Sequence, residues 1–251
     1  MTKPIDLKEE FPHLSKAPIV EAALDIRVVP SVTWNETSLQ SELKQRLPDY
    51  PKVEPLRQTR FQITREKPVD PIVEDFGCVG LKLLSNANPH IAHFNKGIFV
   101  FSRLKPYENW EQLSGEALRL WAIYCELLKP KEVTRVGLRF INRIAIKPAK
   151  IELADYYKYP PKSLEELNWT LTGYLHHDVM QVPETPYRVN VIKTVQNDPG
   201  EIGLILDIDV FMENRFEYNE VHLIESLEKM RWVKNKVFFS SLTDKALSEI
   251  R

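Results

Sequence analysis

Three arginines recur at a spacing of four residues near the middle of the chain, at Arg135, Arg139 and Arg143. They belong to the run 133–146, whose apolar residues alternate as in a half-buried β-strand. Because successive side chains of a strand point to opposite faces, residues four apart share one face. Each guanidinium offers a planar fork of donors that suits phosphate or carboxylate groups. The spacing therefore predicts a basic strand face for an anion, a nucleic acid or a protein partner.

A second explanation of the same arginines needs no ligand. Glu21 and Asp25 lie on the polar side of another alternating run, 19–29. If the two strands are neighbours in one sheet, these carboxylates would pair with the arginines and form a structural ladder of ion pairs. Both explanations stay open at this point, because one sequence does not show which strands are neighbours.

A pair of aspartates supplies an alternative, catalytic hypothesis. Asp207 and Asp209 are two apart in an apolar run, so both would project from one face of a strand. Paired carboxylates often hold Mg²⁺ in phosphotransfer sites. With Asp25 nearby, and with Arg139 and Arg143 as a phosphate clamp, they would form a metal-dependent phosphohydrolase or nucleotidyl-type enzyme. Pairing of the aspartates with the same arginines would explain them without a metal.

Other chemical motifs are mostly excluded by the sequence. The chain has only 8 glycines and contains neither G-x-G-x-x-G nor G-x-x-x-x-G-K-[ST], so no dinucleotide fold or P-loop is expected. The nucleophile elbow G-x-S-x-G is also absent. Cys78 and Cys125 are too few for a disulfide framework and lack C-x-x-C spacing.

The histidines give weaker signals than the arginines. His90 and His93 are three apart on an expected strand, which sends them to opposite faces and argues against a shared metal ion. The segment His176, His177 and Asp178 is expected at the end of a helix, where imidazoles meet the carbonyl end of the helix dipole.

Periodicity predicts the elements that must position these residues. Strands are expected at 19–29, 58–65, 77–84, 91–104 with a turn near Gly97, 133–146, 187–195 and 202–212. Helices are expected from Thr37 or Ser38 to 47, from 109 to 129, from 164 to about 177, from 221 to about 234, and after Thr243, with helical material also at 153–157.

These elements predict an α+β fold, with a mainly antiparallel sheet and helices packed on one of its faces. The order of strand, helix, strands and long helix occurs twice, which indicates two structurally similar β-α-β-β-α halves. The expected division is an N-terminal α+β half at 1–130 and a C-terminal α+β half at 131–251, within two domains or one continuous domain. The two leading strands would then lie near the middle of the sheet, with one face open.

Composition limits the class of protein. The 251 residues are 43% hydrophobic and 27% charged, which is typical of a folded protein, and 34 basic residues nearly cancel 35 acidic ones. Strong sequence-independent binding to nucleic acid is therefore not expected of the molecule as a whole. No run approaches 18 apolar residues and the start is charged, so we expect a cytoplasmic protein with no membrane segment.

Three short segments resemble a known group of proteins. They are Ala17-Pro18-Ile19-Val20-Glu21-Ala22, Arg135-Val136-Gly137-Leu138-Arg139-Phe140-Ile141-Asn142-Arg143-Ile144 and Phe239-Ser240-Ser241-Leu242-Thr243-Asp244-Lys245-Ala246. Together they are similar to an uncharacterised, sporadically distributed prokaryotic family of about this length. That family brings no activity and no catalytic residues. Its sporadic distribution implies accessory genes, such as those of toxin–antitoxin or phage-defence loci.

The sequence as a whole favours a non-enzymatic binding or accessory protein. It would act on a protein or nucleic-acid partner through the open sheet face, with Arg135, Arg139 and Arg143, or through its C-terminal region, and it is compatible with a homo-oligomer. This hypothesis requires no cofactor. The alternative is the Mg²⁺-dependent enzyme built on Asp207 and Asp209.

Overall fold

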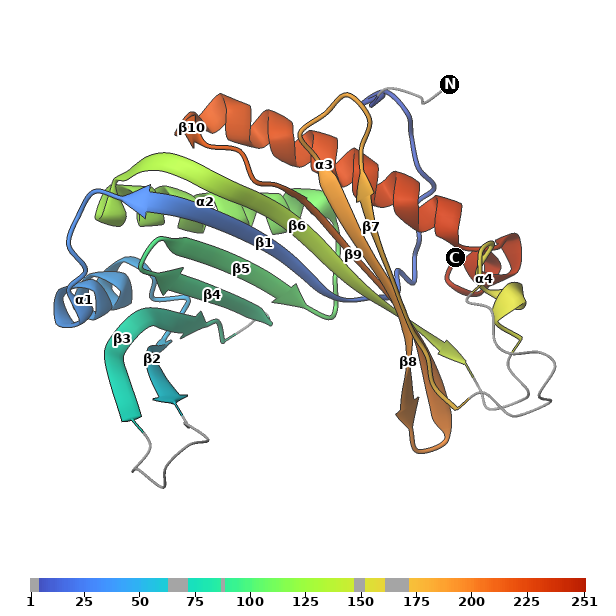
Figure 1. The fold of residues 1–251 in the computed structure, drawn as a ribbon, viewed down its shortest axis with the longest axis horizontal. Coiled ribbons are helices and arrows are strands. Elements are labelled where there is room, and N and C mark those ends of the chain that lie inside the picture. Colours follow the sequence, from blue (N-terminus) through green and yellow to red (C-terminus); the bar gives the residue numbers. More distant parts are fainter. Residues whose placement is uncertain (1–4, 63–71, 87–88, 147–151, 161–171) are drawn as a thin grey trace.

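The computed structural model describes residues 5–62, 72–86, 89–146, 152–160 and 172–251 (Figure 1). One antiparallel sheet of ten strands forms the centre of the fold. Its strands are β1 (Ile19–Pro30), β2 (Lys52–Gln62), β3 (Ile72–Leu84), β4 (His90–Asn95), β5 (Ile98–Leu104), β6 (Pro130–Ile146), β7 (Leu175–Gln181), β8 (Arg188–Asp198), β9 (Glu201–Met212) and β10 (Phe216–Glu217). The helices are α1 (Glu36–Arg46), α2 (Trp110–Leu128), α3 (Glu220–Ser241), α4 (Asp244–Glu249) and a short 3-10 helix, η1 (Leu153–Asp155). The α+β fold expected from the sequence is thus confirmed.

The strand order places the two leading strands, β1 and β6, side by side in the middle of the sheet. Outward from β1 come β5, β4, β3 and β2, and outward from β6 come β9, β8 and β7. A long helix follows the inner strand of each series, α2 after β5 and α3 after β9. The segments 1–130 and 131–251 therefore contribute corresponding series of strands to one continuous sheet.

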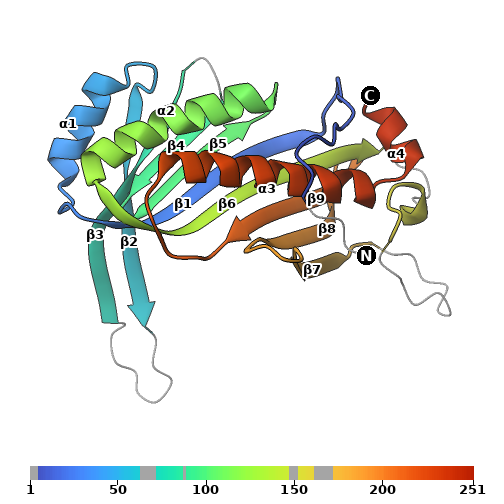
Figure 2. The same cartoon turned by 90° about the horizontal axis from the view of Figure 1, so that it is seen from above.

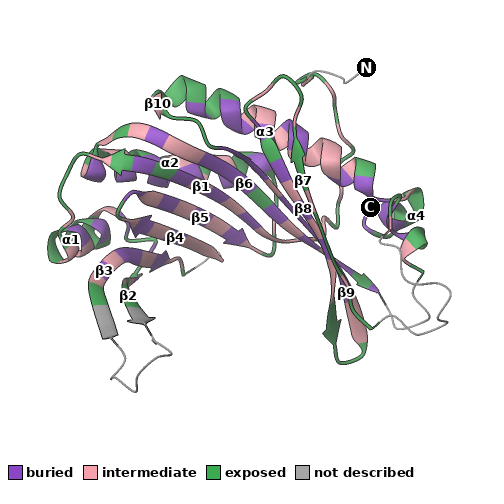
Figure 3. Ribbon diagram, in the orientation of Figure 1, coloured by how far each residue is buried: buried purple, intermediate pink, exposed green. Residues whose placement is uncertain are grey.

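Alternation along β1 and β6 gives the sheet one apolar and one polar face. On β1 the buried residues Ala22, Leu24 and Ile26 alternate with more exposed ones, and Leu138 and Phe140 of β6 are buried in the same way. Figure 3 shows this alternation as changes of colour along both strands. Since residues two apart share a face, the apolar sets of the two strands pack on the same side of the sheet.

The helices α2 and α3 cover that apolar side, and the opposite side of the sheet is left open (Figure 2). The Asn109 side chain caps α2 by accepting a hydrogen bond of 2.8 Å from the Gln112 backbone N–H, as a capping residue should. The helix ends at Lys129, which adopts a left-handed conformation with φ 45°. Among the described residues, no helix combines the length and apolar character needed to cross a membrane.

Aromatic side chains form much of the core between the sheet and α2. Trp121 and Tyr124 of α2 stack with ring centroids 5.3 Å apart, and both lie about 5.5 Å from the ring of Phe99 on β5. All three side chains are almost completely buried. Burial of each such side chain contributes about 2 to 3 kcal/mol, so this cluster holds the N-terminal half of the sheet to its helix.

Three of the expected helices differ from the structure. His176, His177 and Asp178 lie on the edge strand β7 and not at a helix end, and the expected helical residues 164–171 fall outside the described part of the chain. The helix α3 continues to Ser241, beyond the expected end near 234. The N-cap of α1 is Asn35, two residues before the expected position.

Candidate functional site

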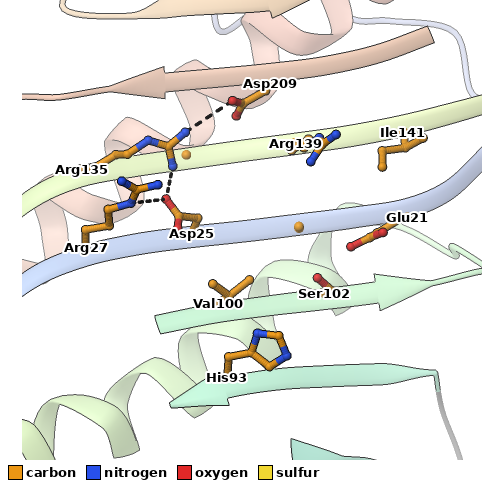
Figure 4. A pocket seen from close by; sticks show the side chains of 12 residues that line it. Glu21, Asp25, Arg27, His93, Val100, Ser102, Arg135, Arg139, Ile141 and Asp209 are labelled. Atoms are coloured by element: carbon orange, nitrogen blue, oxygen red, sulfur yellow. Dashed lines mark hydrogen bonds and ion pairs between the residues drawn. The ribbon is translucent and has the colours of Figure 1, made fainter. Parts of the chain in front are cut away.

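The open face of the sheet is hollowed near its middle, where β1 and β6 meet (Figure 4). The hollow has a volume of about 360 Å³ and is lined by residues of β4, β5, β1, β6 and β9. Arg135, Arg139 and Asp209 belong to its lining. Arg143 lies farther along β6 and borders a separate depression. The three arginines thus share a face, as their spacing predicts, but they do not converge on one point.

Strand register brings carboxylates to both sides of β6. Gly137 of β6 pairs with Asp25 of β1 on one side and with Phe211 of β9 on the other. Arg139 pairs with Asp209 of β9 in the same register. Each arginine can therefore reach an acid on a neighbouring strand directly or diagonally.

Arg135 connects the two halves of the sheet by ion pairs. Its guanidinium donates to Asp25 of β1 and lies 3.4 Å from a carboxylate oxygen of Asp209 on β9. Only 13% of the Arg135 side chain is exposed. The guanidinium lies flat over Gly137, where an added Cβ would stand 2.5 Å from Nη1. A side chain added at this position would therefore displace the guanidinium from its present place.

Arg139 is held by a single acid in a two-point contact. Its Nε and Nη2 donate to the two carboxylate oxygens of Asp207, at 2.9 and 2.5 Å. This fork geometry is the strongest form of arginine–carboxylate pairing. The hydrogen bond with Asp207 raises the pKa of Arg139 above its ordinary value. The Asp207 side chain is 9% exposed, so this acid is directed toward the arginine and away from solvent.

Arg143 is also paired, at the far end of β6. It lies 2.7 Å from Asp198 and 2.6 Å from Glu201, which flank the turn between β8 and β9. The guanidinium passes over Gly203, where an added Cβ would lie 2.5 Å from Nε. All three arginines of β6 are thus satisfied by carboxylates of this chain, as the structural explanation requires.

The carboxylates do not fit a Mg²⁺ site. Asp207 is taken up by Arg139, and Asp209 lies between Arg135 and Asn190, whose amide donates to it at 3.2 Å. Burial raises the pKa of Asp209, against the lowering effect of Arg135, so this environment disfavours the anionic ligand that a hard cation needs. Among the described residues, no three histidine, cysteine or acidic side chains gather as ligands. The acids of the alternative hypothesis, with Asp25, are therefore partners of arginines.

Three polar groups in the hollow lack a hydrogen-bond or ion-pair partner among the described residues. Glu21 of β1 and Ser102 of β5 line it and have no ion pair or hydrogen bond through their side chains with any described residue. The Nε2 atom of His93, on β4, is buried without a hydrogen-bond partner in the described part of the chain. Burial, aided by Lys82 and opposed by Glu21, lowers the pKa of His93, so its ring is neutral at pH 7. Figure 4 shows these three side chains on one side of the hollow.

Sequence reasoning found only part of this arrangement. It predicted the shared face of the arginines and the pairing of Asp25, but it also expected Glu21 to pair with them. His93 was considered only as a metal ligand, and Ser102 was not singled out. Alternation along 91–104 places both on the open face, yet nothing local indicates that β4 and β5 adjoin β1. 

No protein-family model matches the chain, and no curated protein is similar enough to count as a match.

Proposed function

We propose that this chain is a non-enzymatic binding protein whose open sheet face receives a protein partner. The observation that supports this best is which charged side chains in the central hollow have a partner of opposite charge. Its guanidinium groups are engaged by acids of the same chain, while the carboxylate of Glu21 has no such partner among the described residues. A partner that inserts a lysine or arginine side chain would complete the hollow.

Charge favours a protein over a nucleic acid as the partner. Binding to nucleic acid relies on cations that are free to contact phosphates. On β6 these cations already face acids at 2.5 to 3.4 Å, and contact with phosphate would first require breaking these pairs. The free acidic group at Glu21 would repel a phosphate backbone.

The surroundings of Glu21 suit a protein side chain. Ala23, Val100 and Ile141 give the hollow apolar walls beside the polar groups. An aliphatic stem of lysine or arginine packs well on such walls while its charged end meets a carboxylate. The neutral ring of His93 and the Ser102 hydroxyl add hydrogen-bonding groups beside that end. The accessory-gene setting implied by the family resemblance makes products of neighbouring genes the first partners to test.

Affinity capture with matched variants tests the proposal. The bait is the full chain, either unchanged or carrying Glu21→Lys, and the control is Glu42→Lys, which makes the same charge change at an exposed site on α1. We expect a stoichiometric protein partner to be retained by the unchanged chain and by the control. Its retention should fall at least about tenfold with Glu21→Lys, since a cation in the hollow would repel the inserted side chain.

Two results would count against the proposal. One is a partner that binds equally well to all three baits. The other is nucleic acid that copurifies with the bait and is released by moderate salt, in which case titration with labelled duplex and single-stranded oligonucleotides would show steep salt dependence.

A further inference from the structure

A second cavity lies on the covered side of the sheet, beneath α3. Its volume is about 240 Å³, and it is lined by residues of the N-terminal segment 11–19, the segment 107–111 and the second half of α3. Phe11 of the N-terminal segment stacks on Phe239 of α3 with ring centroids 5.5 Å apart, and both residues line the cavity. Tyr107, Trp110 and Phe238 supply further aromatic walls.

Lys234 is the unusual group of this cavity. Its Nζ lies 4.2 Å from the centre of the Phe140 ring and 2.5 Å from the Asn235 side-chain oxygen. It forms no ion pair with any acid in the described part of the chain. By contrast, Lys236 on the same helix lies 2.5 Å from a carboxylate oxygen of Glu9.

The acids of the cavity wall form ion pairs with arginines and not with Lys234. Glu108 lies 2.9 Å from Arg103, and Glu111 lies 3.7 Å from Arg231. Arg231 adds a positive charge near the lysine and no compensating negative one. Burial, with a smaller contribution from Arg231, lowers the pKa of Lys234 to about 7. A large fraction of this amine is therefore neutral at pH 7, whereas an ordinary lysine is almost fully protonated.

We propose that the cavity beneath α3 is a site for a small carbonyl compound, an aldehyde or α-keto acid, that condenses with the amine of Lys234. The neutral Nζ attacks the carbonyl carbon and forms a C–N bond. The carbonyl oxygen leaves as water with both hydrogens of the amine, which gives a C=N bond without any oxidant or reductant. The cavity volume admits a small molecule, and Tyr107, Trp110 and Phe238 offer aromatic surface for its carbon atoms.

Reductive trapping on the intact protein tests this site. The probes are glyoxylate, which carries a carboxylate, and acetaldehyde, which does not, each with cyanoborohydride at pH 7. Peptide mass spectrometry then measures the labelling rate of every lysine. We expect Lys234 to react at least roughly tenfold faster than Lys44, an exposed lysine on α1, because its neutral fraction is far larger. Preference for glyoxylate would identify a keto acid, and equal rates would identify a neutral aldehyde.

The variants Lys234→Arg and Lys236→Arg serve as a matched pair on one helix. The first should remove the fast-labelled site, and the second should leave it unchanged. Labelling of Lys234 in the folded wild-type chain at or below the rate of Lys44 would overturn the proposal, whatever the stability of the variants. So would fast labelling of Lys234 only after denaturation, since the cavity would then exclude the probes.

Discussion

Basic side chains on the two faces of the sheet have different partners. On the open face, Arg135, Arg139 and Arg143 each meet one or two carboxylates. On the covered face, Lys234 has an aromatic ring and an amide as its neighbours and no ion-paired acid among the described residues. The comparison shows that the tertiary structure decides which basic side chains of this chain have an acidic partner.

The physical reason for the difference lies in the neighbouring strands. On the open face, β1 and β9 flank β6 and place acids in register with its arginines. Each guanidinium therefore stays charged and is held in place by its ion pairs. Beneath α3 no described acid lies in ion-pair contact with the Lys234 ammonium group, and the cost of desolvating this group favours its neutral form. The first arrangement connects strands, whereas the second supports the reactivity that we propose for the Lys234 amine.

The largest expected effect comes from removing the central arginine. Arg135→Met should lower the free energy of unfolding by about 3 kcal/mol, because Asp25 and Asp209 would be left partly buried without a cation. Urea denaturation measures the change. The loss should shrink at acid pH, because burial raises the pKa of Asp209 and favours its protonated, uncharged form there. An equal loss at pH 4 and pH 7 would show that packing, and not charge, gives Arg135 its importance.

An intermediate effect is expected at Lys234. Its pKa is about 7 in the folded chain and near 10.5 when unfolded, so the unfolded state binds more protons between these values. Stability should therefore rise with pH from about 7 toward 10, and it lacks this contribution below 7. Lys234→Met should be more stable than the wild type by at least about 1 kcal/mol at pH 6, and this advantage should shrink steadily as the pH rises toward 10.

Differential measurement removes the contributions of other groups. Burial raises the pKa of Cys125 to about 12, which makes stability fall above pH 9 in both proteins. The difference between wild type and Lys234→Met cancels that effect. A difference that does not change between pH 6 and pH 10 would mean that the Lys234 amine is not destabilised by its surroundings.

The smallest effect is expected at the end of β6. Arg143→Met should cost less than about 1 kcal/mol, because its partners Asp198 and Glu201 are 41% and 46% exposed and remain well hydrated without it. The measurement is again urea denaturation, and Arg135→Met is the matched comparison. Equal losses for the two variants would contradict the distinction between a central and a peripheral ion pair.

The sequence predicted strands in which buried and exposed residues alternate better than it predicted the edge strand β7 and the end of α3. Alternation revealed β1 and β6 because both have one buried and one open side. The edge strand β7 lacks such a pattern, since six of its seven residues are exposed, and its conformation depends on pairing with β8. The last part of α3, residues 235–241, was not predicted because Lys236 and Phe239 contact Glu9 and Phe11 of the distant N-terminal segment, and no local pattern indicates these contacts.

The sequence by itself determined which residues share a face, because the two-residue period of a strand is a local property. It thus identified an arginine face and an aspartate pair within an α+β fold. The tertiary structure alone decided that these groups neutralise one another, since Arg135 and Asp25 are 110 residues apart and Arg139 and Asp207 are 68 apart. It also decided that Glu21 and Lys234 are left without counter-ions in the described part of the chain. Charge pairing depends on which strands become neighbours, and that choice is made by packing between distant segments.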